Sequence, residues 1–401
     1  MAYDVEQVRA QFPALAGGVA HFDGPGGTQT PEPVAAAVAD TLRSSISNRG
    51  RTTASERRAD DVVAAARTAM GDLLGMDPRG VVFGRSMTQL TYDFSRALAK
   101  NWGPGDEVLV TRLDHDSNVR PWVQAAEQVG ATVRWVDFDT TTGELSDESL
   151  SDALSDRTRL VAVTAASNLI GTKPDIPAIA DAVHAAGALL YVDGVHYTPH
   201  VHVDVERLGA DFFGCSPYKF LGPHCGVVGA RPDLLASVEA DKLLPATDDV
   251  PERFELGTLP YELLAGTTAA VDFHAALGDG GTRRASLAAA YAALEKHEDS
   301  LRTRLESALA DIPGIILYSR AQHRTPTLLF ALDGIESAAV HRALADRDIN
   351  APAGSFYALE ASRRLGLGDA GAVRVGLAPY TNDDEIDRLI TGVREIAQNK
   401  S

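Results

Sequence analysis

The sequence has few cysteines, fewer basic than acidic residues and no long apolar run. Its only cysteines, Cys215 and Cys225, cannot form a disulfide framework, match no zinc pattern and predict a reducing, cytoplasmic location. With 37 Lys and Arg against 55 Asp and Glu, the net charge of −18 disfavours nucleic acid and anionic membranes as partners. No run of about 18 apolar residues indicates a membrane span. The first residues, Met1–Glu6, lack the basic and apolar regions of a signal peptide.

The middle of the chain alternates short apolar runs with Ala-rich helical patterns. This alternation predicts an α/β fold in which helices cover both faces of a mostly parallel, seven-stranded sheet. In such sheets a ligand lies beyond the carboxyl ends of the strands. The predicted strands are Gly80–Gly84, Glu107–Thr111, Thr132–Val136, Leu160–Ala165, Ala188–Asp193, Phe212–Cys215 and Gly226–Ala230.

The pattern changes at about Thr267, after which long helical stretches surround a few short apolar runs. This second pattern predicts a smaller C-terminal α+β domain. Paired glycines favour a flexible joint, so we place the domain boundary at Asp279-Gly280-Gly281. The expected organisation is an N-terminal segment 1–20 that packs on the domains, a large cofactor-binding domain 21–278 and a small domain 279–401.

Asp193 and Lys219 carry the strongest indication of chemistry. The apolar run Ala188–Val192 ends in Asp193, and Lys219 follows one helix-and-strand unit later in the turn Cys215–Pro223. A buried carboxylate is costly unless it is paired, and a protonated pyridine nitrogen would pair with it. A Lys in such a turn supplies an amine for a Schiff base. Together the two residues predict pyridoxal phosphate, whereas each alone is more typical of an ordinary turn or surface position.

Polar residues follow three other predicted strands. The turn Gly84–Gln89 opens a helix, where free N–H groups and the hydroxyls of Ser86 and Thr88 favour an anion; an ordinary N-cap is the alternative. His115 can stack on a flat cofactor, and Asn168 can donate to a phenolate oxygen. Taken alone, a capped loop His and an Asx turn explain these two residues better.

The remaining polar candidates lie further along the chain. Ser216 and Tyr218 carry hydroxyls that can reach a phosphate, and Thr258 places another beside Gly257. Arg374 lies in the apolar run Ala372–Leu377, where a guanidinium needs a carboxylate partner. Its forked donors suit the carboxylate of an amino-acid substrate, and a structural ion pair is the alternative.

Taken in order, these residues resemble the class V aminotransferase family of pyridoxal phosphate enzymes, fold type I, and its cysteine desulfurase-like branch. The resemblance implies the transferase fold of that family, pyridoxal 5′-phosphate as cofactor, an amino-acid substrate and a homodimer with shared active sites. It assigns catalytic roles to Lys219, His115 and Asp193. Further cofactor contacts are implied for Ser86, Met87, Thr88, Asn168, His196, Ser216, Tyr218 and, from the partner subunit, Thr258; Arg374 is implied as the substrate-binding residue.

The sequence departs from the desulfurase pattern at three places. The stretch Asn350–Tyr357 has no Cys where that branch carries its nucleophilic Cys. We expect Cys215 and Cys225 to be buried and inert. His196 stands where a Gln is usual, and Tyr218 where a His is usual, so both are candidates for a different handling of protons.

The missing Cys favours a C–S lyase, which needs only a leaving group on Cβ of cysteine or of an S-substituted cysteine. An aminotransferase or epimerase of the same family is the main alternative. Less favoured are a persulfide-forming desulfurase and a protein that binds pyridoxal phosphate without turnover. Candidates for setting the substrate are Arg49, Arg51, Arg120 and Tyr261.

Overall fold

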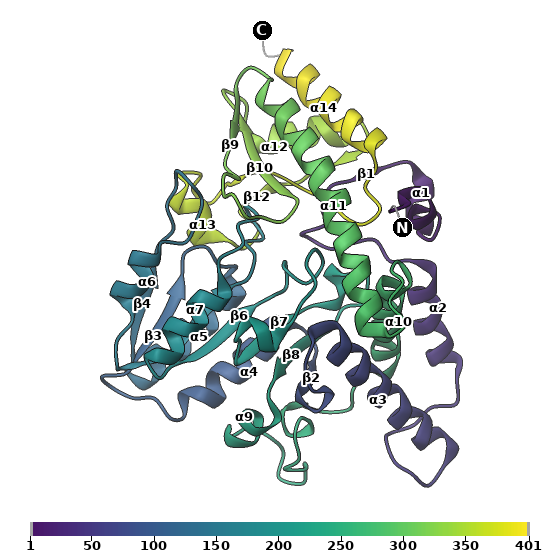
Figure 1. The fold of residues 1–401 in the computed structure, drawn as a ribbon, viewed down its shortest axis with the longest axis vertical. Coiled ribbons are helices and arrows are strands. Elements are labelled where there is room, and N and C mark those ends of the chain that lie inside the picture. The colour runs from purple at the N-terminus through teal and green to yellow at the C-terminus, as the bar shows by residue number, and fades with distance from the viewer. Residues whose placement is uncertain (1–2, 399–401) are drawn as a thin grey trace.

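The computed structural model describes residues 3–398, without the side chain of Asp147. A large sheet and a small sheet organise the chain, and they lie in the lower and upper parts of Figure 1. A third pairing joins the short parallel strands β1 (Ala20–His21) and β11 (Ile349–Asn350).

The large sheet has seven strands in the order β2-β8-β7-β6-β5-β3-β4. The pairs from β7 to β4 are parallel, whereas β8 is antiparallel to both of its neighbours. The predicted α/β fold with a mostly parallel sheet is therefore confirmed. Its strands are β2 (Val81–Gly84), β3 (Glu107–Thr111), β4 (Thr132–Val136), β5 (Thr158–Thr164), β6 (Leu189–Asp193), β7 (Phe212–Cys215) and β8 (Gly226–Ala230).

Alternate residues of these strands pack against opposite faces of the sheet, as the pleat requires. Val108 and Val110 of β3 share a core with Trp122 of α5, whereas Leu109 shares the other core with Val183 of α7. Both faces are therefore buried, which explains the nearly continuous apolar strands. One face is covered by α4 (Met87–Ala99) and α5 (Arg120–Val129), the other by α3 (Ala54–Leu74), α7 (Ile176–Ala185) and α10 (Tyr261–Ala276).

The small sheet is antiparallel, with the strand order β12-β13-β10-β9. Helices α11, α12 and α14 contribute apolar residues to the core on one of its faces. Its strands are β9 (Ile315–Leu317), β10 (Thr327–Leu332), β12 (Ala353–Gly354) and β13 (Ala372–Gly376), and its helices are α11 (Arg283–Ala310), α12 (Ser337–Ala345), α13 (Leu359–Arg364) and α14 (Asp383–Gln398).

Helix α11 joins the two parts, as the long green helix of Figure 1 shows. Leu287 and Leu294 pack in the core of the large sheet, whereas Leu301 and Leu309 pack in the core of the small one. The joint expected at residues 279–281 precedes this helix. Because α11 is one continuous helix with apolar residues in each core, it couples the two parts mechanically. The division into domains at residue 278 stays a prediction.

The other helices are short or lie at the edges of the fold. The sequence patterns did not indicate α2. Among residues 3–398, no helix is both long enough and apolar enough to cross a bilayer. These helices are α1 (Val5–Arg9), α2 (Glu32–Arg43), α6 (Asp147–Ala153), α8 (Val205–Leu208) and α9 (Pro232–Ser237).

Candidate active site

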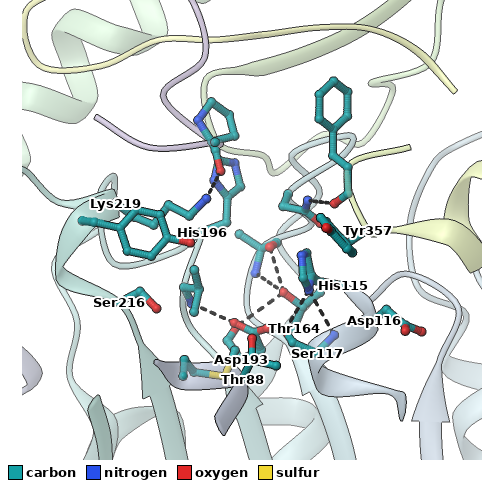
Figure 2. Close-up of a pocket in the computed structure, with 18 of the residues that line it drawn as sticks. Thr88, His115, Asp116, Ser117, Thr164, Asp193, His196, Ser216, Lys219 and Tyr357 are labelled. Atoms are coloured by element: carbon teal, nitrogen blue, oxygen red, sulfur yellow. Dashed lines mark hydrogen bonds between the residues drawn. The ribbon is translucent and has the colours of Figure 1, made fainter. Parts of the chain in front are cut away.

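A cavity of about 630 Å³ lies at the carboxyl ends of strands β3, β5, β6 and β7. This is the edge at which ligands bind in open α/β sheets. Residues from the small domain close the cavity from the opposite side, and Figure 2 shows side chains from both sides converging on it. Ten of the predicted site residues line it, namely Met87, Thr88, His115, Asn168, Asp193, His196, Ser216, Tyr218, Lys219 and Arg374.

Asp193 is the last residue of β6 and is almost fully buried. One carboxylate oxygen accepts the backbone N–H of Val195 at 2.9 Å. Among residues 3–398 no cation forms an ion pair with it, and burial raises its pKa to about 6. Since a buried carboxylate without a cation is unfavourable, the cavity is suited to a ligand that carries a positive charge or an N–H at this point.

Lys219 ends a short turn after β7, and its amine enters the cavity. The Nζ donates to the backbone carbonyl of Pro25 and lies 4.9 Å from the ring centroid of Tyr218. Burial, and after it the nearby Arg374 guanidinium, lowers the pKa of Lys219 to about 7, against smaller opposing effects of Asp23 and Asp193. A large share of the amine is therefore neutral and nucleophilic near neutral pH.

His115 follows β3 and lies beneath the cavity (Figure 2). Its Nδ1 accepts the backbone N–H of Ser117 at 3.0 Å and lies 2.7 Å from the Ser117 hydroxyl. Burial, with Lys219 nearby, lowers the pKa of His115 to about 4, so the ring is neutral at pH 7. The neighbouring Asp114 accepts from Asn118 Nδ2 at 2.7 Å, which holds this loop in place.

The predicted anion-binding turn is formed where β2 leads into α4. Met87 and Thr88 line the cavity, whereas Ser86 does not, because its hydroxyl accepts the N–H of Gln89 at 3.1 Å as the N-cap of α4. A Cβ at Gly226 would lie 2.1 Å from the carbonyl carbon of Ser86, so only glycine lets β8 approach this turn. The phosphate-binding role of Ser86 stays a prediction.

Asn168 connects the floor of the cavity to a loop of the small domain. Its Nδ2 donates to the carbonyl of Phe356 at 2.9 Å, and its Oδ1 is buried without a partner among the described residues. The loop, Ser355–Tyr357, is here called the capping loop. The N–H of Asp116 donates to the Tyr357 carbonyl at 2.7 Å, so two loops of the large domain hold it.

The capping loop is strained. Phe356 and Tyr357 have φ values of 52° and 59°, in the left-handed region that residues with a Cβ rarely adopt. Their two carbonyl acceptors offset that strain. Tyr357 is mostly exposed, and its ring centroid lies 5.5 Å from that of His115.

Arg374 is 2% exposed and reaches the cavity from β13. One Nη donates to Asp23 at 2.7 Å and the other to the carbonyl of Asn168 at 3.1 Å. The guanidinium also lies 3.7 Å from the ring centroid of Phe356, and its Nε is buried without a partner in the described chain. Arg374 thus forms the structural ion pair that was the alternative in the sequence, and its Nε keeps an unused N–H.

His196 and Tyr218, the two departures from the desulfurase pattern, both line the cavity. His196 Nε2 lies 3.0 Å from the hydroxyl of Thr325 and 2.9 Å from that of Thr327. Burial, reinforced by His200, lowers the pKa of His196 well below its usual value. The Tyr218 ring stacks on His224 with a centroid distance of 4.5 Å.

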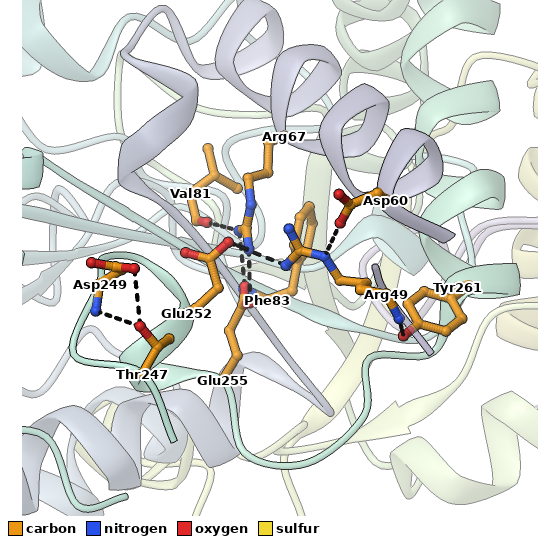
Figure 3. Close-up of polar contacts among 10 residues, drawn as sticks. All are labelled: Arg49, Asp60, Arg67, Val81, Phe83, Thr247, Asp249, Glu252, Glu255 and Tyr261. Atoms are coloured by element: carbon orange, nitrogen blue, oxygen red, sulfur yellow. Dashed lines mark hydrogen bonds and ion pairs between the residues drawn. The ribbon is translucent and has the colours of Figure 1, made fainter. Parts of the chain in front are cut away.

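Thr258 lies away from this cavity, beside a separate one of about 220 Å³. The segment before it is fastened to α3 and β2 by the ion pairs in Figure 3. Buried Arg67 binds Glu255 at 2.7 Å, and Arg49 binds Asp60 at 2.7 Å and Glu252 at 3.1 Å. Of the residues suggested to set the substrate, only Arg120 lines the main cavity. A single chain does not test the prediction that Thr258 contacts the cofactor of the partner subunit.

Both cysteines are buried. Burial raises the pKa of the Cys215 thiol far above its ordinary value and that of Cys225 to about 11. Neither cysteine lines the main cavity. Since the thiolate is the nucleophilic form, both positions are unfavourable for sulfur transfer.

Comparison with known proteins agrees with this geometry. The profile of the Aminotransferase class-V family matches residues 20–389. The chain belongs to the class V aminotransferase family. Similar proteins are the uncharacterized protein MT3887 of Mycobacterium tuberculosis (34% identity over 99% of this chain and 100% of its own) and the aminotransferase-like protein FGM3 of Gibberella zeae (32% over 98% and 99%). The crystal structure of the cysteine desulfurase CsdA of Escherichia coli covers 100% of both chains with a TM-score of 0.88 and 28% identity.

Within the class V aminotransferase family, the chain is a cysteine desulfurase-like enzyme that depends on pyridoxal 5′-phosphate. The cavity fits that cofactor. Asp193 offers a buried carboxylate for a pyridinium N–H, and Lys219 offers a neutral amine. The Asn168 Nδ2, which would donate to a phenolate oxygen, already donates one N–H to Phe356, so that contact stays a prediction. Thr88 and Ser216 line the cavity with hydroxyls, which suit a phosphate.

Several residues of the cavity were missed in the sequence. Asp23 and Pro25 come from the Gly-rich segment after β1, and Phe356 and Tyr357 come from the capping loop. The only signals in the sequence were an Asp before Gly24-Pro25-Gly26-Gly27 and two aromatic residues in a loop noted for its missing Cys. Neither signal indicates a contact partner.

Proposed function

We propose that this enzyme cleaves the C–S bond of cysteine or of an S-substituted cysteine by β-elimination. The observation that supports this proposal most is the capping loop. Where the desulfurase branch carries a nucleophilic Cys, this chain places Ser355, Phe356 and Tyr357, and both of its cysteines are buried elsewhere. A β-elimination needs no protein thiol.

The residues around the cavity can perform the shared first steps of such a reaction. When bound, pyridoxal phosphate supplies an electron sink for the bond that breaks at Cα. Lys219 is a base of suitable pKa for the α-proton, and Asp193 holds the proton of the ring nitrogen. The free Nε of Arg374 offers a donor to the carboxylate of the substrate, so that the amino acid is oriented.

The environment of Arg374 also favours a substrate of modest size. Phe356 covers one face of the guanidinium and the capping loop closes the cavity above it. Arg120, paired with Asp116 at 2.9 Å, lies on the wall of the cavity and is the residue we assign to the side-chain end of the substrate. Its paired charge suits a neutral, polar group better than a second free carboxylate.

Product analysis tests the proposal. The cofactor-loaded protein would be incubated with L-cysteine and with a panel of S-substituted cysteines. Pyruvate, ammonia and free thiol in equal amounts are the expected products. Alanine together with a protein persulfide would contradict the proposal and would favour a persulfide-forming desulfurase instead.

An aminotransferase of the same family is the second candidate. It is favoured by the FGM3 relative, which is named aminotransferase-like. It predicts a keto acid that retains the side chain of the substrate and a cofactor left in the amine form. An epimerase would give the other enantiomer with no change in the cofactor, so the same experiment separates all three reactions.

We also propose the homodimer that the family resemblance implies. The fastened segment before Thr258 supports it, because Arg67, Glu252 and Glu255 hold that segment rigidly at the protein surface, where Leu256 exposes 53% of its side chain. Sedimentation of the cofactor-loaded protein would test it, with a mass twice 42.5 kDa expected.

A further inference from the structure

A further cavity of about 390 Å³ is lined in part by Thr325, whose hydroxyl contacts His196 of the active-site cavity. We call it the rear cavity. Its rim is formed by exposed residues that include Lys296, Asp299 and Gln322, so it opens to solvent. Its floor contains the buried residues His200, Glu298 and Thr325.

His196 separates the two cavities. Its side chain lines the active-site cavity, and its Nε2 lies 3.0 Å from Thr325 Oγ1, on the floor of the rear cavity. Figure 2 shows His196 beside Lys219. At this point, therefore, the wall between solvent in the rear cavity and the reacting groups consists only of the His196 imidazole and the Thr325 hydroxyl.

Unsatisfied polar atoms lie on both sides of this wall. His196 Nδ1 is buried without a partner among residues 3–398, and so is Glu298 Oε1 in the rear cavity. The other Glu298 oxygen lies 2.9 Å from His200 Nδ1, and the His200 ring centroid is 5.2 Å from that of His196. Buried polar atoms of this kind are usually satisfied by ordered water, which makes a hydrated path through this wall favourable.

Burial keeps the His196 ring neutral, and His200, Arg374 and Lys219 also disfavour a proton on it. Glu298 contacts His200 on the side of the rear cavity. A neutral imidazole has one nitrogen that accepts and one that donates. It can therefore take a proton on one side and release another on the opposite side without holding a charge for long.

We propose that protons pass between solvent and the active site through the rear cavity, Thr325 and His196. A hydronium ion protonates the Thr325 hydroxyl while that hydroxyl passes its own proton to His196 Nε2. The Nδ1 proton then leaves to an acceptor in the active-site cavity, so three bonds to hydrogen break and three form. The inference deepens the proposed function, because lyase and aminotransferase reactions both exchange protons with groups in the active site.

Thr325 and Thr327 provide a matched pair for the test. Both hydroxyls contact His196 Nε2, but only Thr325 lines the rear cavity. Exchange of the His196 ring N–H hydrogen with solvent would be followed by nuclear magnetic resonance of the 15N-histidine-labelled, cofactor-loaded protein without substrate. We expect Thr325→Val to slow this exchange by about 10-fold and Thr327→Val to change it by less than about twofold.

Three controls accompany the exchange measurement. Thr325→Ser keeps the hydroxyl and should exchange like the wild type. In the cofactor-free protein, Thr325→Val should also exchange nearly like the wild type, because the active-site cavity then admits water. Exposed His323, on the rim of the rear cavity, should exchange equally in every variant.

Two results would overturn the route. One is unchanged His196 exchange in loaded Thr325→Val, and the other is equal slowing in Thr327→Val, which would reveal loss of a hydrogen bond and nothing more. If Thr325→Val did not fold or bind the cofactor, Thr325→Ala against Thr325→Ser would give the same comparison. Because no substrate is present, these outcomes are independent of which reaction the enzyme catalyses.

Discussion

The two sides of the active-site cavity are built in different ways. On the large-domain side, His115, Asp193 and Lys219 each follow a strand or its turn, and each has a pKa displaced by burial. On the small-domain side, the capping loop is held by two backbone acceptors against unfavourable φ values. The sheet therefore supplies the chemistry, whereas the loop supplies enclosure and the setting of Arg374.

This contrast indicates where the family can change its reaction. The sheet edge positions the groups that we assign to the cofactor, and we expect their displacement to abolish the shared first step. The capping loop is held by two hydrogen bonds, so we expect its side chains to change without disturbing the sheet. A loop of this kind is where function varies on a conserved scaffold.

Removing Lys219 should have the largest effect. Lys219→Ala should abolish covalent attachment of the cofactor after borohydride reduction and reduce turnover by about a thousandfold or more, because both nucleophile and base are lost. Mass spectrometry of the reduced protein measures the attachment. Lys100→Ala, which removes surface ion pairs with Glu239 and Asp241, is the matched control and should behave like the wild type. A reduced adduct that persists in Lys219→Ala would refute the assignment.

The low pKa of Lys219 can be measured in the cofactor-free protein. Its neutral amine reacts with acylating reagents, and the neutral fraction rises as pH increases through the folded pKa of about 7. At pH 7 its neutral fraction should exceed that of an ordinary Lys by on the order of a thousandfold. Peptide mapping of acylated Lys219 between pH 5 and 10, from about two units below to about three units above the folded pKa of about 7, gives the profile. A midpoint of acylation near pH 10 would show that Lys219 does not lie in a buried environment that lowers its pKa.

Asp193→Asn should separate stability from function. The folded pKa of Asp193, about 6, lies above the usual value of 3.8, so the cofactor-free wild type loses stability as pH rises from about 4 to about 6. Above that range the variant should be more stable by about 1–3 kcal/mol, and below it the two should be equal. Urea unfolding at one pH below about 4 and at one pH above about 6 measures this difference in stability between the variant and the wild type.

The cofactor-loaded protein should show the opposite order for the same substitution. There the Asp193 carboxylate has a cationic partner, and turnover should fall by about 100-fold in Asp193→Asn. A variant that is less stable than the wild type at high pH without cofactor would mean that the carboxylate is already satisfied by the protein.

The capping loop should have a smaller, more selective effect. Phe356→Leu removes the ring that lies 3.7 Å from the Arg374 guanidinium, so KM should rise by about threefold to thirtyfold with little change in kcat. Tyr357→Phe removes only an exposed hydroxyl and should stay within about twofold of the wild type. Equal effects of the two substitutions, or a loss confined to kcat, would show that the loop does not act through Arg374.

The sheet side could be predicted from the sequence, because each of its residues directly follows a recognisable apolar strand. Asp193, Lys219 and His115 lie close to the patterns that indicate them, and the α/β order brings those patterns to one edge. The loop side could not be predicted. Asp23 meets Arg374 across 351 positions and Asn168 meets Phe356 across 188, and no local pattern encodes such contacts.

Replacing both cysteines should have the smallest effect. Cys215→Ala with Cys225→Ala removes two buried thiols that lie outside the cavity and carry raised pKa values. Each truncation costs about 1 kcal/mol of stability, yet turnover should stay within about twofold, because no step of a β-elimination uses a thiol of the protein. Release of pyruvate and of thiol should be measured together with bound cofactor. If sulfur release disappeared while the cofactor stayed bound, a cysteine would carry the sulfur, and the difference between this capping loop and that of the desulfurases would have to be explained by a displaced nucleophile.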